Sequence, residues 1–267
     1  MLLGRPELDL EDAGSIATAI SKARCDVIVN AAAYTAVDKA EQEPGQAFRI
    51  NGEGAGHVAR VAATLGVPLV HISTDYVFDG RLFRPYREDD RVGPSGVYGR
   101  SKLDGETRVL AAHSDSVILR TAWVYSPFGA NFVRTMLRLG ETREEVGVVA
   151  DQTGNPTSAL DIADAVLAIT ARIIADKSPE LRGVFHMTGQ GDASWADLAE
   201  AIFAAAEKHG RMPVRVRRIT SADYPVAAKR PANSRLDNGK LLEKFGVGLP
   251  HWHGSLTACV DRLLAKA

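Results

Sequence analysis

The stretch "PLVHISTDY", residues 68–76, is the clearest indication of the fold class of this protein. Its first half is mainly apolar and β-branched, which is typical of a strand buried on both faces, and its end is polar. A helical stretch that ends near Gly66 precedes it, so we predict a buried strand over 68–74. A strand of this kind belongs to a parallel sheet, where ligands bind beyond the carboxyl ends of the strands.

Similar units lie on both sides of this strand. The segment "DVIVNAAA", residues 26–33, follows an amphipathic stretch over 12–24, and "SVILRTAWVY", residues 116–125, follows a predicted helix over 97–112. Helices that alternate with apolar strands predict an α/β fold, a Rossmann-like doubly wound parallel sheet. The three strand ends, residues 31–35, 73–76 and 121–125, should therefore line one crevice.

The pattern changes after about residue 155. Helices are predicted over 161–174 and 194–209, with strands over 184–187 and 212–219, and the spacing is less regular. We therefore expect two units: a Rossmann-like dinucleotide-binding domain over 1–155 and a smaller lobe, mainly substrate-binding, over 156–267.

Composition excludes several classes of partner. The 267 residues include 32 basic and 33 acidic side chains, and a formal net charge of −1 gives no reason to expect nucleic acid or an anionic membrane. No apolar run approaches the roughly 20 residues of a membrane span. Cys25 and Cys259 lie far apart in no metal-like or redox-like spacing, and we interpret both as small buried hydrophobes. These features predict a cytoplasmic protein.

Candidate catalytic residues follow from one spacing. In "VYGRSKLDGE", residues 97–106, Tyr98 and Lys102 are four positions apart and share a helix face. Thr74, at the end of the strand over 68–74, adds a hydroxyl that could orient a substrate carbonyl. Tyr98 would transfer the proton, and the Lys102 ammonium would favour the phenolate, since a tyrosine of ordinary pKa is a poor base at neutral pH.

Six segments in this order resemble one family. The sequence resembles the dTDP-4-dehydrorhamnose reductases, members of the extended short-chain dehydrogenase/reductase superfamily, from about residue 8 to the C-terminus. The resemblance is carried by "NAAAYTAVDKAE", "STDYVFDG", "VYGRSKLDGE", "RTAWVYSPFGANFVRTMLRL", "DQTGNPTSALDIADAV" and "RPANSRLD". It implies an oxidoreductase that reduces the 4-keto group of dTDP-6-deoxy-L-lyxo-4-hexulose to dTDP-L-rhamnose with NADPH or NADH.

The resemblance also implies roles for individual residues. Thr74, Tyr98 and Lys102 take the catalytic positions: hydride comes from the nicotinamide, and Tyr98 protonates the alkoxide. The implied substrate-binding residues are Thr74, Asp75, Trp123, Arg230, Asn233 and Ser234, with Trp123 against the deoxysugar and Arg230 suited to a pyrophosphate. The implied cofactor-binding residues are Asp9, Leu10, Ala33, Tyr34, Thr35, Tyr98 and Lys102.

One part of the family pattern is not found in this sequence. Rossmann enzymes begin with a strand, a glycine-rich turn and a helix that binds the cofactor pyrophosphate. The glycines of "NGEGAGH", residues 51–57, have a different spacing and are better explained by close helix packing. Without that unit, we expect residues 1–267 alone to bind NADPH weakly and to show no measurable reduction. The choice between NADPH and NADH also stays open.

Several alternatives remain open at this point. A non-catalytic relative with the same fold, the regulatory subunit of methionine adenosyltransferase, is one, and another nucleotide-sugar reductase or epimerase is a second. A homodimer is a further expectation. Mg²⁺ occurs in parts of the family, but the sequence predicts no metal site, since His251 and His253 lack acidic or cysteine partners nearby.

Overall fold

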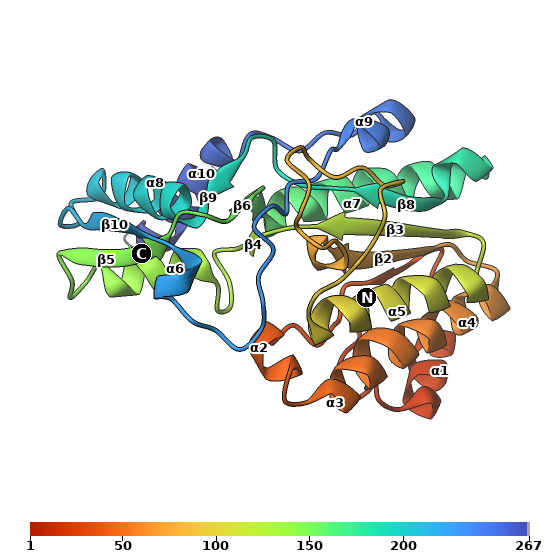
Figure 1. Ribbon diagram of the computed structural model, residues 1–267. Helices are drawn as coiled ribbons and strands as arrows, with labels where there is room; N and C mark the ends of the chain where they lie inside the picture. Colours follow the sequence, from red (N-terminus) through yellow and green to blue (C-terminus); the bar gives the residue numbers. More distant parts are fainter. Residues whose placement is uncertain (266–267) are drawn as a thin grey trace.

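A parallel sheet forms the centre of the computed structural model, which describes residues 1–265 (Figure 1). Four strands lie in the order β1 (Ile28–Asn30), β2 (Leu69–Thr74), β3 (Ser116–Thr121) and β8 (Gly183–His186), and all pair in parallel. The predicted α/β fold with a Rossmann-like parallel sheet is confirmed. Because Asn30 pairs with His71, and Thr74 with Thr121, the carboxyl ends of these strands lie along one edge.

Helices cover both faces of this sheet. On one face lie α1 (Ala13–Lys22), α4 (Ala55–Leu65) and α5 (Val97–Ala112), which pack on Leu69 and Ile118. On the other face α7 (Ala159–Ala175) packs on alternate residues such as Val70 and Val117. This alternation is the two-residue period of a strand, and it explains why the strands are apolar throughout.

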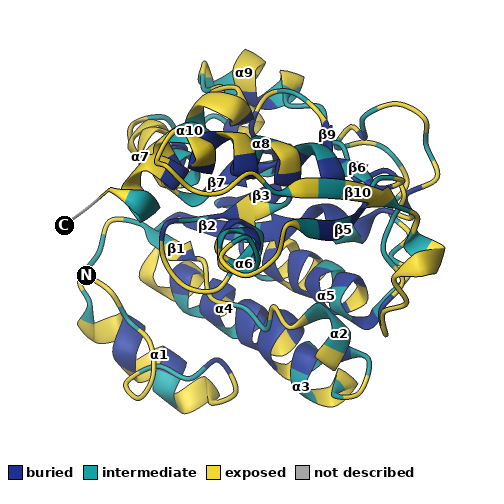
Figure 2. Cartoon of the chain, turned by 90° about the vertical axis from the view of Figure 1, so that its left-hand side faces the viewer, coloured by how far each residue is buried: buried dark blue, intermediate teal, exposed yellow. Residues whose placement is uncertain are grey.

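A second lobe surrounds its own apolar core at the carboxyl ends of the strands. Its core is formed by α6 (Phe132–Leu139), α8 (Trp195–Glu207), α10 (Trp252–Leu264) and the parallel pair β5 (Glu145–Val149) and β10 (Arg215–Ile219). Figure 2 shows that the helices of both lobes turn their buried sides inward. The remaining elements are α2 (Val37–Ala40), α3 (Pro44–Phe48), η1 (Arg49–Gly54), η2 (Asp75–Val77), β4 (Val124–Tyr125), β6 (Thr153–Gly154), β7 (Thr157–Ser158), η3 (Pro179–Leu181), β9 (Ala193–Ser194), η4 (Ser221–Asp223) and α9 (Gly239–Phe245).

The expected division at residue 155 needs a correction. α7 and β8 lie in the half assigned to the substrate-binding lobe, yet β8 pairs with β3 and α7 packs on the central sheet. Conversely, α6 and β5 precede residue 155 and belong to the second core. The chain passes between the lobes several times, because the apolar faces of these elements match different cores.

Two smaller expectations also change. The single strand expected over 116–125 is broken at Trp123, which has a left-handed backbone (φ 47°), so β3 and β4 pair with different strands. The charged stretch "ETREEV", residues 141–146, runs into β5, which begins at Glu145. Of the two cysteines, Cys259 is buried as predicted, whereas Cys25 is only half-buried.

The glycines of residues 51–57 mark close packing of helices, as predicted. A Cβ at Gly52 would collide with the Asp104 carboxylate on α5, and one at Gly54 would lie 2.5 Å from the Leu10 carbonyl oxygen. Gly105 of α5 in turn meets the Asn51 carbonyl. The π-helical turn η1 can therefore lie directly against α5, which holds the catalytic candidates.

β1 lies at one edge of the sheet, with Val29 42% exposed. Among residues 1–265, no strand followed by a glycine-rich turn and a helix is present. None of the helices in this part of the chain has the length and apolar character needed to cross a membrane.

Candidate active site

Thr74 and Asp75 lie where β2 ends and the short helix η2 begins. The Thr74 side chain caps this turn: its Oγ accepts a hydrogen bond from the Tyr76 amide and donates one to Asp75 Oδ1, at 2.9 Å. The other oxygen, Asp75 Oδ2, is buried and has no hydrogen-bond partner among the described residues. Burial raises the pKa of Asp75 to about 6, against the opposing effect of the hydrogen bond from Thr74 and of the nearby Ser234 hydroxyl. An unpaired buried acceptor at a strand end suits a sugar hydroxyl.

Tyr98 lies in the first turn of α5, whose predicted bounds of 97–112 are confirmed. Its ring meets Tyr76 edge to face, with 5.5 Å between centroids. Burial raises the pKa of Tyr98 to about 12, opposed by a hydrogen bond with Thr74. Tyr98 is therefore protonated at neutral pH, which is the state required of a proton donor to an alkoxide.

Lys102 lies one turn further along α5 and is almost fully buried. Its Nζ donates to the Ile72 carbonyl oxygen at 2.7 Å and lies 3.4 Å from His71 Nε2. Burial lowers the pKa of Lys102 to about 8, while the nearby Glu106 carboxylate acts in the opposite direction. His71 is itself hydrogen-bonded to Asn30 of β1, so a chain of buried polar groups crosses two strands and reaches Lys102.

Lys102 shares a face of α5 with Tyr98, but its ammonium group is hydrogen-bonded to the main chain of β2. Nζ donates to the Ile72 carbonyl oxygen at 2.7 Å. Burial raises the pKa of Tyr98 in this structure, so the lowering of that pKa by Lys102 stays a prediction.

The turn after β1 is tied to the same helix by Asn51. The Asn51 side chain accepts from the Tyr34 amide at 2.8 Å and donates both to the Tyr34 carbonyl and to Ser101 Oγ on α5. The predicted cofactor residues Ala33, Tyr34 and Thr35 thus lie beside the Tyr98 turn.

The other two predicted cofactor residues precede α1. The Asp9 carboxylate pairs with Arg5 at 3.1 Å and accepts a hydrogen bond from the Glu11 amide. Leu10 is buried with Ile50 in the core below α4. Asp9 is half-buried, and its carboxylate faces partners from its own segment.

Trp123 projects from the break between β3 and β4. Its indole Nε1 donates to Ser234 Oγ at 3.0 Å, and its ring stacks on Trp195, which the sequence did not single out. Gly154 approaches the same ring so closely that any side chain there would collide with it. The Ser234 hydroxyl, which also donates to the Thr153 carbonyl oxygen at 3.4 Å, therefore connects Trp123 to β6 and lies near Asp75.

Arg230 reaches the site from the opposite side, but it is already paired. Its Nη2 donates to Asp38 Oδ2 at 2.6 Å, and the guanidinium lies 5.9 Å from the centre of the Tyr76 ring. Its Nη1 is buried with no hydrogen-bond partner in the described chain. Asp38 also accepts from the Ala228 amide, so α2 holds the 228–230 segment in place. No pattern in the sequence indicated this partner, which is 192 residues away.

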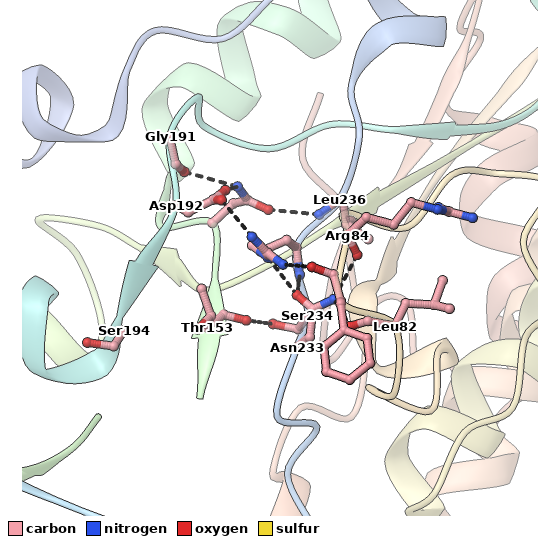
Figure 3. Close-up of polar contacts among 12 residues, drawn as sticks. Leu82, Arg84, Thr153, Gly191, Asp192, Ser194, Asn233, Ser234 and Leu236 are labelled. Atoms are coloured by element: carbon pink, nitrogen blue, oxygen red, sulfur yellow. Dashed lines mark hydrogen bonds and ion pairs between the residues drawn. The ribbon is translucent and has the colours of Figure 1, made fainter. Parts of the chain in front are cut away.

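Asn233 and Ser234 lie in the loop after Arg230, and Figure 3 shows how this loop is fixed. The Asn233 amide donates to the carbonyl oxygens of Leu82 and Arg84, and its Oδ1 accepts from Arg235. With both ends of its amide engaged, Asn233 supports the loop, whereas the Ser234 hydroxyl faces Trp123 and Asp75.

A buried ion pair lies beneath the site and was not anticipated. Glu106 of α5 accepts two hydrogen bonds from Arg120 of β3, at 2.9 and 2.7 Å, and a third from Ser73 at 2.5 Å. Both charged side chains are at most 5% exposed. The single arginine within the apolar segment 116–125 was the available signal, because a buried charge requires a partner. This pair fixes α5 against the ends of β2 and β3.

The comparisons with known proteins agree with this geometry. The family model described as "RmlD substrate binding domain" matches residues 1–265. A dTDP-4-dehydrorhamnose reductase of Sinorhizobium fredii is 51% identical over 266 residues, covering 100% of this chain and 90% of the relative.

The chain belongs to the dTDP-4-dehydrorhamnose reductase family. The resemblance stated from its motifs is confirmed. Members of the dTDP-4-dehydrorhamnose reductase family are NAD(P)H-dependent oxidoreductases.

Solved structures of dTDP-4-dehydrorhamnose reductases superpose well on this chain. The enzyme of Clostridium acetobutylicum has a TM-score of 0.89 at 39% identity, covering 96% of this chain and 87% of its own. That of Bacillus anthracis, solved in complex with NADP, has a TM-score of 0.88 at 34% identity, covering 99% and 89%. Its bound NADP agrees with the prediction of a nicotinamide cofactor.

Metal binding finds no support in the part of the chain that the structure describes. There, no group of three or more His, Cys, Asp and Glu side chains could hold a metal ion. His251 and His253 stack on each other at the start of α10, with 5.2 Å between ring centroids.

Proposed function

We propose that this chain supplies the catalytic and substrate-binding residues for reduction of the 4-keto group of dTDP-6-deoxy-L-lyxo-4-hexulose to dTDP-L-rhamnose. The observation that carries the proposal is the convergence of the protonated Tyr98 at the start of α5 with the Thr74 hydroxyl and the buried Asp75 carboxyl group at the end of β2. Thr74 would turn its single hydroxyl proton from Asp75 Oδ1 to the keto oxygen, and Asp75 would accept from a neighbouring hydroxyl of the sugar. Tyr98 would donate its proton to the oxygen as the carbonyl is reduced.

A nicotinamide cofactor fits the residues beside Tyr98. The turn at Ala33 and Tyr34 is fixed against α5 by Asn51, and Lys102 offers a buried ammonium one helical turn away. NADPH or NADH would supply the hydride when bound there. The chain's own residues would orient the keto group and exclude water from it, since Thr74 and Asp75 are buried.

The same geometry separates the alternatives. A non-catalytic subunit of the methionine adenosyltransferase type has no need for the Thr74, Tyr98 and Lys102 arrangement. Another nucleotide-sugar reductase or epimerase could use these three residues, and the choice of sugar then depends on few contacts. The 51% identity to a named dTDP-4-dehydrorhamnose reductase favours the proposed substrate.

The test is a turnover assay with product analysis. The keto-sugar nucleotide and NADPH are incubated with residues 1–267 and with a form extended at the N-terminus by the glycine-rich strand, turn and helix of a relative. We expect the extended form to consume NADPH and to release dTDP-L-rhamnose, identified by NMR. An extended form that folds, binds NADPH and yields no dTDP-L-rhamnose would refute the proposed function.

A second prediction concerns Arg230. Its unpaired Nη1 is a buried donor, which suits a pyrophosphate oxygen. We expect Arg230→Ala to weaken dTDP-L-rhamnose binding by roughly 10- to 100-fold, the value of one charge-assisted hydrogen bond, and to leave NADPH binding unchanged. Calorimetry with each ligand on the extended form measures both. Arg230→Lys, which keeps the charge without the planar fork, should fall between. Equal loss for both ligands would give Arg230 a structural role.

We also propose the cytoplasm as the site of action and a homodimer as the assembly. Two cysteines without a disulfide partner support a reducing compartment. Light scattering of the purified protein would test the assembly: a monomer at micromolar concentration would contradict it.

A further inference from the structure

Trp123 has an unusual backbone that its surroundings must maintain. Its φ of 47° lies in the left-handed region, which bulky residues rarely adopt because the Cβ approaches the neighbouring carbonyl. Strain of this kind persists only where neighbouring groups fix the residue. Trp123 is half-buried and lies beyond the carboxyl end of β3, beside Ser234 and Asp75.

Trp195 supplies most of this support. The two indole rings stack with 3.6 Å between centroids and 6° between planes. Aromatic pairs generally prefer an offset or edge-to-face arrangement, so this parallel contact is imposed by the groups around it. Gly154 allows it, because a side chain at that position would occupy the space of the Trp123 ring.

Trp195 is itself held on three sides. It is the first residue of α8, and the cap at Ser194 fixes the helix start through reciprocal hydrogen bonds with Asp197. Its Nε1 donates to Gln152 Oε1 at 3.2 Å, and Phe132 of α6 packs on its ring with 4.8 Å between centroids. The position of the Trp195 ring is thus set by the second lobe before any ligand is considered.

We propose that Trp195 is a positioning residue for the sugar of the substrate, acting through Trp123. Its ring fixes the plane of Trp123, which then presents a rigid apolar surface to the deoxysugar. This inference depends on the proposed function, because that function places the sugar against Trp123. Trp195 makes no contact with substrate in this account and takes no part in the proton transfer.

Two ligands distinguish the contribution of the sugar to binding from that of the nucleotide. Calorimetry is carried out with dTDP-L-rhamnose and, in parallel, with dTDP, which lacks the sugar. We expect Trp195→Ala to weaken binding of dTDP-L-rhamnose about tenfold, the upper range for an aromatic contact, and to leave binding of dTDP within about twofold. Trp195→Phe keeps an aromatic ring behind Trp123 and should restore most of the affinity for dTDP-L-rhamnose.

Circular dichroism detects the stacking of Trp123 on Trp195 without any ligand. The chain has three tryptophans, and stacked indoles give a paired positive and negative signal that an isolated indole does not. Trp195→Ala and Trp195→Phe should both lose this signal. Trp252→Phe is the control: Trp252 is buried in the same core, but it stacks on His253, so this variant should keep the signal. If Trp195→Ala fails to fold, Trp195→Leu provides a second variant, since it fills part of the apolar space and still removes the aromatic ring behind Trp123.

The outcomes are distinct. Weaker binding of dTDP-L-rhamnose alone, with the dichroic signal lost, supports the inference. Equal weakening of dTDP and dTDP-L-rhamnose, or unchanged binding of both, overturns it and leaves the proposed function standing. If the unaltered chain binds dTDP-L-rhamnose no more tightly than dTDP, the inference and the assignment of the sugar both fail.

Discussion

Tyr98→Phe should reduce kcat of the extended form by about 10²- to 10⁴-fold, the range for loss of a positioned proton donor. The variant removes only the hydroxyl group, and the ring keeps its edge-to-face contact with Tyr76. Binding of dTDP-L-rhamnose and of NADPH should therefore change little. Burial raises the pKa of Tyr98 to about 12, so Tyr98 stays protonated between pH 6 and 9. The loss of kcat should therefore be the same at every pH in that range.

Tyr125→Phe is the matched control for this experiment. Tyr125 is also buried, and its hydroxyl donates to the Trp252 carbonyl oxygen at 3.2 Å in the second lobe. We expect Tyr125→Phe to lower the free energy of unfolding by about 1 kcal/mol and to leave kcat unchanged. A Tyr98→Phe variant with near-normal kcat would remove Tyr98 from the mechanism and leave the proton donor unidentified.

Arg120→Met should have the largest effect on stability. The substitution leaves the Glu106 carboxylate buried without its cation, because both side chains are almost fully shielded from water. Breaking a buried pair from one side costs about 3–5 kcal/mol of unfolding free energy. Urea denaturation of residues 1–267, monitored by circular dichroism, measures this loss without any cofactor.

Two further variants give this prediction its control. Arg108→Met breaks the exposed pair with Asp104 on the same helix, at 2.7 Å, and should cost less than about 1 kcal/mol. Arg120→Met combined with Glu106→Leu removes both buried charges and should recover much of the loss. If Arg120→Met and Arg108→Met cost the same, the buried pair does not stabilise the fold as described.

The parts of the fold that the sequence predicted are those set by local pattern. The α5 helix over 97–112 and the strand before Thr74 follow from apolar periodicity and flanking residues, and both are confirmed within one residue. The break at Trp123 was missed because nothing in "RTAWVY" interrupts a strand. It depends on Trp195, Gly154 and Ser234, which come from other parts of the chain.

The same distinction applies to the candidate site. Residue types and spacing identified Thr74 and Tyr98, and the family resemblance added Asp75 beside Thr74 at the end of β2. They could not give the direction of a flexible side chain, and Lys102 is turned to the Ile72 carbonyl rather than to Tyr98. Nor could they show that Arg230 has a carboxylate partner, because that contact exists only once both lobes have folded.

The pairing of Arg230 with Asp38 means that the arginine already carries its own counterion. A diphosphate arriving at Arg230 would not meet an uncompensated positive charge; it would exchange places with, or share the guanidinium with, the Asp38 carboxylate. Asp38 is 46% exposed, so water is ready to solvate it once displaced. The free energy of binding at this position would then be the difference between two ion pairs, while the hydrogen bond from the Ala228 amide could still hold Asp38 to the 228–230 segment.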